Sequence, residues 1–66
     1  MQQQQPPQLL RLPEVKKLTG LGRTQIYRLQ KQGKFPKLVK LGARASAWAS
    51  TEVHAWIADR IAESRP

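Results

Sequence analysis

The side chains best suited to recognition chemistry lie between residues 23 and 32, on one side of a segment with helical spacing. At about 100° per residue, Ile26 and Leu29 point to one side of such a helix and polar side chains point to the other. Arginine can bind guanine, and glutamine can bind adenine, through two hydrogen bonds. The polar residues are hydrogen-bonding groups, cations and one aromatic, without an acid: Arg23, Thr24, Gln25, Tyr27, Arg28 and Lys31. This face therefore has the chemistry needed to contact nucleic acid.

The basic residues are concentrated in the middle of the chain. The formal net charge is +8, and no Asp or Glu occurs between Glu14 and Glu52. Lys37, Lys40 and Arg44 continue the basic character beyond the helical segment. Such a block of one sign is typical of a surface that binds a polyanion. The alternative is a solvated basic surface without a partner, but nothing within the block offsets the mutual repulsion of its cations.

No pattern for catalysis, metal binding or a cofactor accompanies this block. His54 is the only histidine and the chain has no cysteine, so we interpret His54 as a packing or surface residue rather than a ligand or base. The glycine-rich run at residues 20–23 lacks the lysine and hydroxyl residue of a phosphate-binding loop. We therefore predict that the protein is not an enzyme and binds no metal or cofactor.

A chain of 66 residues predicts one small domain. No apolar run approaches the ~20 residues needed to span a bilayer, and no signal-peptide core is present. The last helix carries acids, which argues against a membrane-surface peptide. We predict a disordered tail over residues 1–8, low in complexity and broken by proline, and one folded domain over residues 9–64. Leu9, Leu10 and Leu12 are expected to form a short extended lead-in that packs on the core.

Two short helices joined by a tight turn would hold the polar face in place. The apolar spacing predicts helices over about residues 13–18 and 23–32. Gly20 would end the first helix in the left-handed conformation, and Gly22 would be the N-cap of the second. Leu21 is expected to fix the turn to the core. This is the layout of a helix-turn-helix, and the alternative is an αα-hairpin in an ordinary small helical domain.

A β-hairpin and a third helix complete the prediction. Strands are expected over residues 37–41 and 45–48, with Arg44 in the turn, and Ser50 is expected to be the N-cap of the last helix. We expect Tyr27 to pack its ring on the hairpin and direct its hydroxyl at a phosphate, rather than stack on a base. The predicted fold is mainly α, a winged helix-turn-helix of three helices and a two-stranded wing. Its predicted core contains Val15, Leu18, Ile26, Leu29, Trp48, Trp56 and Ile57.

Four short motifs add a further signal. They are the Thr-Gly-Leu turn at residues 19–21, Ile-Tyr-Arg at residues 26–28, Lys-Phe-Pro at residues 34–36, and Trp48 followed by Glu-Val and Ala-Trp-Ile within residues 52–57. Together they resemble the AlpA-type prophage regulators, which belong to a wider group of MerR-like excisionases and small winged helix-turn-helix proteins. The resemblance covers about residues 10–62.

The resemblance implies a double-stranded DNA-binding protein of the bacterial cytoplasm. Such proteins activate or repress a promoter, often that of an integrase, and relatives act instead as excisionases that bend attachment-site DNA. By position, residues 23–25, Tyr27 and Arg28 match the family's recognition helix, and Arg44 matches its wing. The long coiled coil and effector domain of MerR activators are absent from the sequence, so sensing of a small molecule is not implied.

The expected partner is therefore duplex DNA, with further copies of the chain or an integrase as candidate partners on the DNA. Because no heptad run is present, we expect a monomer in free solution. The alternative from another class is a nonspecific RNA-binding basic protein. It is less favoured because RNA binders of this size expose several aromatic residues for stacking, and Tyr27 is the one candidate here.

Overall fold

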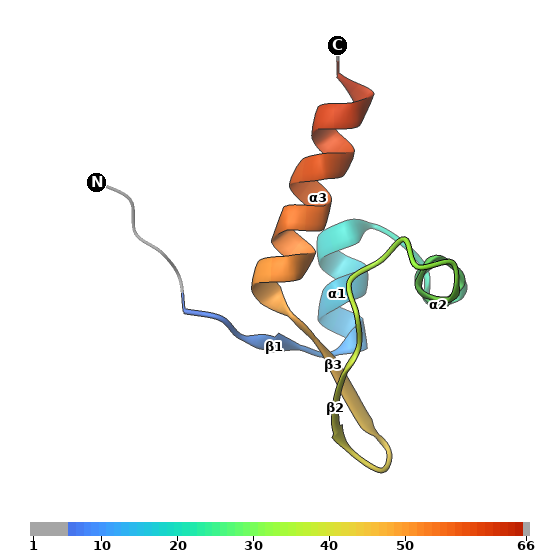
Figure 1. Ribbon diagram of the computed structural model, residues 1–66, viewed down its shortest axis with the longest axis vertical. Helices are drawn as coiled ribbons and strands as arrows, with labels where there is room; N and C mark the ends of the chain where they lie inside the picture. The colour runs from blue at the N-terminus through green and yellow to red at the C-terminus, as the bar shows by residue number, and fades with distance from the viewer. Residues whose placement is uncertain (1–5, 66) are drawn as a thin grey trace.

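The computed structural model describes residues 6–65 and contains three helices and one small antiparallel sheet. The hairpin and the last helix extend to opposite ends of the molecule, and the two shorter helices lie at its middle (Figure 1). None of the helices in residues 6–65 combines the length and apolar character that crossing a bilayer demands. The elements, in chain order, are β1 (Leu9–Leu10), α1 (Leu12–Thr19), α2 (Arg23–Lys31), β2 (Val39–Gly42), β3 (Ala45–Ala49) and α3 (Ser50–Ser64).

The helix-turn-helix forms as the sequence predicted, with helix ends that differ by one residue. Gly20 has φ 76°, in the left-handed region, and its N–H donates to the Lys16 carbonyl. The Thr19 hydroxyl donates to the Val15 carbonyl at 2.8 Å and accepts from the N–H of Leu21 at 3.2 Å. Leu21 is partly buried and packs against the core. Side-chain and backbone bonds therefore fix the angle between α1 and α2.

The sheet contains one strand more than predicted. Its order is β1-β3-β2, so the hairpin's second strand is central. The two-residue β1 pairs antiparallel with β3, which places Leu10 opposite Trp48. The predicted two-stranded wing is confirmed as the hairpin of β2 and β3, and the expected extended lead-in adds a third strand to the sheet. Because a two-residue strand has no alternation to detect, its pairing depends on a partner about forty positions along the chain.

Ser50 has a different role from the predicted one. The N-cap of α3 is Ala49, and no side chain caps this helix. Ser50 is buried, and its hydroxyl oxygen accepts a hydrogen bond from the N–H of Gln8 at 2.8 Å. Its own N–H donates to the Gln8 carbonyl at 2.7 Å. Ser50 therefore joins the segment before β1 to the start of α3, and the part of the predicted tail at residues 1–5 lies outside the described residues.

The core is centred on Trp48, whose side chain is 1% exposed. The ring of Phe35 meets Trp48 edge-on at a centroid distance of 6.3 Å and meets Trp56 at 5.0 Å. Among the predicted core residues, Leu29, Trp56 and Ile57 are partly buried and pack against this cluster. The members of the buried cluster are Leu10, Val15, Ile26, Phe35, Trp48 and Val53.

Leu18 is not a core residue, although its spacing from Val15 predicted one. Its side chain is 45% exposed, whereas Val15 is completely buried. Three residues of an α-helix turn the side chain by about 60° away from its starting direction. This rotation brings Leu18 to the edge of the core, where it lines a shallow hollow beside Lys17 and His54.

The burial pattern makes a stability prediction. Trp48→Ala should lower the free energy of unfolding by about 3–5 kcal/mol, because it leaves a large cavity at the centre of the core. Leu18→Ala should cost about 1 kcal/mol or less, because nearly half of that side chain is already in water. Urea unfolding followed by circular dichroism measures both. Equal losses for the two variants would contradict the assignment of the core.

Candidate nucleic-acid interface

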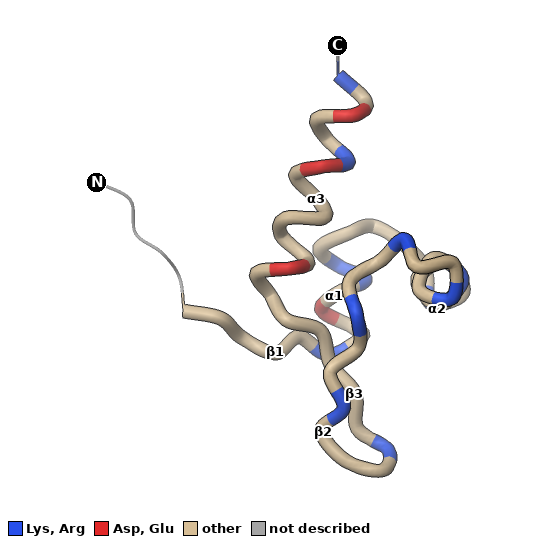
Figure 2. The backbone as a smooth tube through the Cα atoms, in the orientation of Figure 1, with Lys and Arg blue, Asp and Glu red and all other residues tan. Residues whose placement is uncertain are grey.

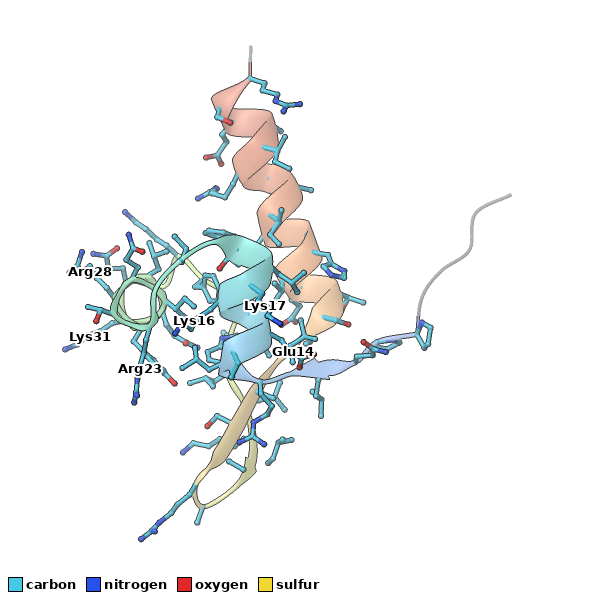
Figure 3. The ribbon with its side chains drawn as sticks, turned by 180° about the vertical axis from the view of Figure 1, so that it is seen from behind. Glu14, Lys16, Lys17, Arg23, Arg28 and Lys31 are labelled. Carbon is cyan, nitrogen blue, oxygen red and sulfur yellow. The ribbon has the colours of Figure 1, made fainter. Side chains whose placement is uncertain are left out.

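The polar face of α2 is directed away from the body of the protein. Ile26 is completely buried and holds the opposite side of the helix against the core. Figure 3 shows Arg23, Arg28 and Lys31 pointing outward, away from α1 and α3. Thr24 is exposed beside them. The helix therefore presents donors and cations to solvent over its whole length.

Gln25 belongs to the same helix but is engaged locally. Its side-chain oxygen accepts a hydrogen bond from the N–H of Gly22 at 3.0 Å. Gly22 is the N-cap of α2, and a glycine has no side chain with which to cap the helix. Gln25 makes the other bond of a capping box, in which the side chain of the third helical residue accepts from the N–H of the N-cap residue. A bidentate contact with adenine needs both the oxygen and the nitrogen of this amide, so such a contact competes with the cap.

Tyr27 links α2 to the hairpin. Its ring lies 6.2 Å from the ring of Trp48 in β3, at a tilt of 53°. The guanidinium carbon of Arg23 lies 5.8 Å from the centre of the tyrosine ring. Tyr27 is 39% exposed, so one side packs on the sheet and the other faces water. The prediction that its ring packs on the hairpin is confirmed, and the hydroxyl's contact with a phosphate remains a proposal.

The three basic residues predicted near the wing do not lie together. Lys40 is in β2 and Arg44 is in the turn before β3, and both are exposed. Lys37 precedes β2 and lines a groove on the side of α3, together with Glu52 and Asp59. The structure therefore places Lys40 and Arg44 on the hairpin and places Lys37 beside acidic residues.

The cations are spread over the molecule, but the acids are confined to α1 and α3. In Figure 2, the tube is blue but not red along α2 and the hairpin, and the acidic residues lie on α3 and α1. The ion pair found among residues 6–65 joins Arg60 to Glu63 within α3. Cations on α2 and the hairpin therefore have no acidic partner within the described part of the chain, and their charge is available to an external anion.

A hollow of about 420 Å³ lies in the corner between α2, the hairpin and the start of α1. Two of its polar residues, Arg11 and Ser46, were not among the predicted site residues. Arg11 lies between two leucines in the predicted lead-in, where no sequence signal marks it as a site residue. The pairing of β1 with β3 brings it to the hairpin. We call this hollow the corner hollow; it is lined by Arg11, Leu12, Pro13, Tyr27, Arg44, Ser46 and Trp48.

Nothing in the described part of the chain resembles a metal centre. No group of three or more His, Cys, Asp or Glu residues gathers within residues 6–65. His54 is exposed on α3 and lines the shallow hollow beside Lys17 and Leu18. The recognisable chemistry of the surface is therefore that of hydrogen-bond donors and positive charge.

These features define a small winged helix-turn-helix domain with an acid-free face on its second helix and its wing. The model of the family described as "Prophage CP4-57 regulatory protein (AlpA)" matches residues 8–61. The chain belongs to this AlpA family of prophage regulatory proteins, as its motifs indicated.

A relative from Enterobacteria phage P4, described as "Uncharacterized protein ORF88", is 53% identical over 53 residues. The match covers 80% of this chain and 60% of the relative, so the chain spans about three-fifths of the length of that protein. No solved structure matches the chain.

The bond between Gln25 and Gly22 makes a testable prediction. Gln25→Ala removes the acceptor and should lower stability by about 0.5–1.5 kcal/mol. Gln25→Glu keeps an acceptor and adds a negative charge at the positive end of the helix dipole, so its stability should match or exceed that of the wild type. Thermal and urea unfolding compare the three proteins. If Ala and Glu at this position give equal stability, the capping bond contributes nothing.

Proposed function

We propose that this chain is a sequence-specific double-stranded DNA-binding regulator, with α2 in the major groove and the hairpin against the sugar-phosphate backbone. The observation that carries the proposal is the acid-free face that runs from α2 onto the hairpin. A helix presented in this way fits the major groove, and the second helix of a helix-turn-helix inserts there with its first residues toward the bases.

Different residues of this face have different tasks in the proposal. Arg23, Thr24 and Arg28 project from α2 toward base edges, where an arginine can bind guanine through two hydrogen bonds. Lys31, Lys40 and Arg44 contact phosphates, which adds affinity without distinguishing sequences.

Two of the predicted site residues, Gln25 and Lys37, contribute less to DNA binding in this proposal. Gln25 contributes mainly by capping α2, because its oxygen is bonded to Gly22. Lys37 lines the groove on the side of α3, together with acids and cations of that groove: Glu52, Asp59, Lys34 and Arg60. We therefore place the binding surface on α2, the turn of the hairpin and β2, and place Lys37 outside it.

The family supports a regulatory task in a prophage, since its description is that of a prophage regulatory protein. The phage P4 relative supports a phage setting through its source. The proposed target is a promoter in phage or prophage DNA. Repeated sites there would let further copies, or an integrase, bind beside the first molecule.

The first measurement is the dependence of duplex affinity on salt. If roughly five or six phosphates are neutralised, log K should fall against log salt with a slope of about −5. Lys40→Ala should make the slope shallower by up to about 1, and Lys37→Ala should change it much less. Fluorescence anisotropy with a labelled duplex gives these slopes. A slope near zero for the wild type, or stronger binding to structured RNA than to duplex DNA, would contradict the proposal.

The second measurement locates the source of specificity. The preferred site is first selected from a random duplex pool, and each variant is then titrated against that site and a scrambled duplex at one salt concentration. Arg28→Ala should reduce the ratio of the two affinities by roughly 5- to 160-fold, which corresponds to about 1–3 kcal/mol. Lys40→Ala should lower both affinities and leave the ratio almost unchanged. If Arg44→Ala removes the ratio and Arg28→Ala does not, the wing rather than α2 determines specificity.

A further inference from the structure

The corner hollow combines side chains from separate parts of the chain. Arg11 comes from the link between β1 and α1, Tyr27 from α2, Arg44 from the turn of the hairpin, and Ser46 from β3. In the ladder of β1 and β3, Leu10 is opposite Trp48. Arg11 directly follows this pair, and it lines the hollow together with Ser46 of β3. The fold thus brings together four side chains with hydrogen-bond donors, which lie up to 35 positions apart in sequence.

The polar groups of the hollow are suited to one kind of ligand. Each guanidinium offers five N–H donors in a planar fork, and the tyrosine and serine hydroxyls add one donor each. No acid lines this hollow. Glu14 is the nearest acid to Arg11 in sequence, and its carboxylate accepts the backbone N–H of Arg11 at 3.4 Å. Glu14 lines the separate hollow on the other side of α1, and no Arg11–Glu14 ion pair is found among residues 6–65, so the Arg11 guanidinium is available to an external anion.

Apolar residues complete the lining of the hollow beside its polar groups. Trp48 is 1% exposed, and Leu12 and Pro13 complete the lining. Charges beside such a surface are less screened by water than charges on an open helix. An anion that enters the corner meets two guanidinium groups, those of Arg11 and Arg44, instead of a single surface lysine.

We propose that the corner hollow binds one phosphodiester of the DNA backbone and that Arg11 is a DNA-contacting residue. This inference rests on the proposed function. The hollow is lined by residues of α2, the hairpin and the start of α1. The DNA backbone at the edge of the major groove passes such a corner when the helix occupies the groove and the wing lies beside it. Arginine, tyrosine and serine are also typical donors to DNA phosphates, and arginine forms bidentate contacts with them.

Such a contact positions the protein without distinguishing sequences. Arg11 belongs to the lead-in to α1 and Arg44 to the hairpin, so one phosphate held by both would connect the two parts that flank α2. The depth to which α2 enters the groove would then be set in part by this phosphate. Arg11 should accordingly influence affinity for every duplex by the same factor.

The matched pair of variants is Arg11→Gln and Lys17→Gln. Each removes one positive charge near α1, but Lys17 lies on the side of α1 near Glu14 and α3 (Figure 3), lining the other hollow. Arg11→Gln should weaken binding to the preferred and scrambled duplexes equally, on the order of tenfold, and make the salt slope shallower by about 1. Lys17→Gln should weaken binding less than about twofold. Circular dichroism melts check that both variants fold like the wild type.

Replacing single DNA phosphates by uncharged groups identifies which phosphate the corner hollow binds. In a series of duplexes, each backbone phosphate is replaced in turn by an uncharged methylphosphonate. One position should weaken wild-type binding on the order of tenfold and weaken Arg11→Gln binding clearly less, because that variant has lost the Arg11 part of the contact and keeps the Arg44 part. Arg11→Lys keeps the charge without the fork and should show an intermediate loss at that position.

The outcomes separate the inference from the function on which it rests. If the wild type binds duplex DNA but Arg11→Gln and the wild type lose the same affinity at every methylphosphonate, the corner hollow holds no phosphate and the inference is wrong. If Arg11→Gln changes the ratio between preferred and scrambled sites, Arg11 contacts bases and the inference is also wrong. If the wild type binds no duplex, the proposed function fails and the inference fails with it.

Discussion

The burial of Trp48 is the interaction on which the rest of this small domain depends. Its strand, β3, is the middle strand of the sheet and pairs with both β1 and β2. Its ring meets Phe35, from the loop after α2, and Tyr27, from α2 itself. One indole thus joins the hairpin, the helix-turn-helix and the lead-in strand. A chain of 66 residues has no room for a second core, so the geometry of the candidate interface follows from the packing around this residue.

The same packing explains how an exposed site is kept in shape. Tyr27 is half in water, yet its position is fixed because its ring rests on a fully buried tryptophan. Arg23 lies over the outer side of that tyrosine. Rigid support of this kind lowers the entropy lost when a surface side chain binds a ligand. The buried Trp48 therefore fixes the position of Tyr27, and Tyr27 in turn supports Arg23 on the surface.

Local signals allowed much of the fold to be predicted, and distant contacts account for what was missed. The helix-turn-helix depends on residues within about fifteen positions of one another, such as Gly20 at φ 76°, and the sequence placed it within one residue. Three features that were missed join segments about forty positions apart. They are the pairing of β1 with β3, the bonds between Gln8 and Ser50, and the place of Arg11 in the corner hollow. A propensity or a period cannot encode such pairings.

The electrostatic attraction between the basic surface and a polyanion such as DNA acts only over a short distance. It therefore contributes to the approach, whereas direct contacts contribute to the choice among sequences. The molecule extends 40 × 28 × 19 Å; α3 carries acids and Arg60, whereas the hairpin at the other end carries basic residues without acids (Figure 2). This length exceeds the screening distance of about 8 Å at physiological salt. The basic hairpin and α2 therefore attract a polyanion only when the polyanion is within roughly one screening length. At that position the far end of α3 is too distant for its acids to repel the polyanion strongly. The charge pattern can orient the final approach, but the choice among sequences has to come from atoms in contact on α2.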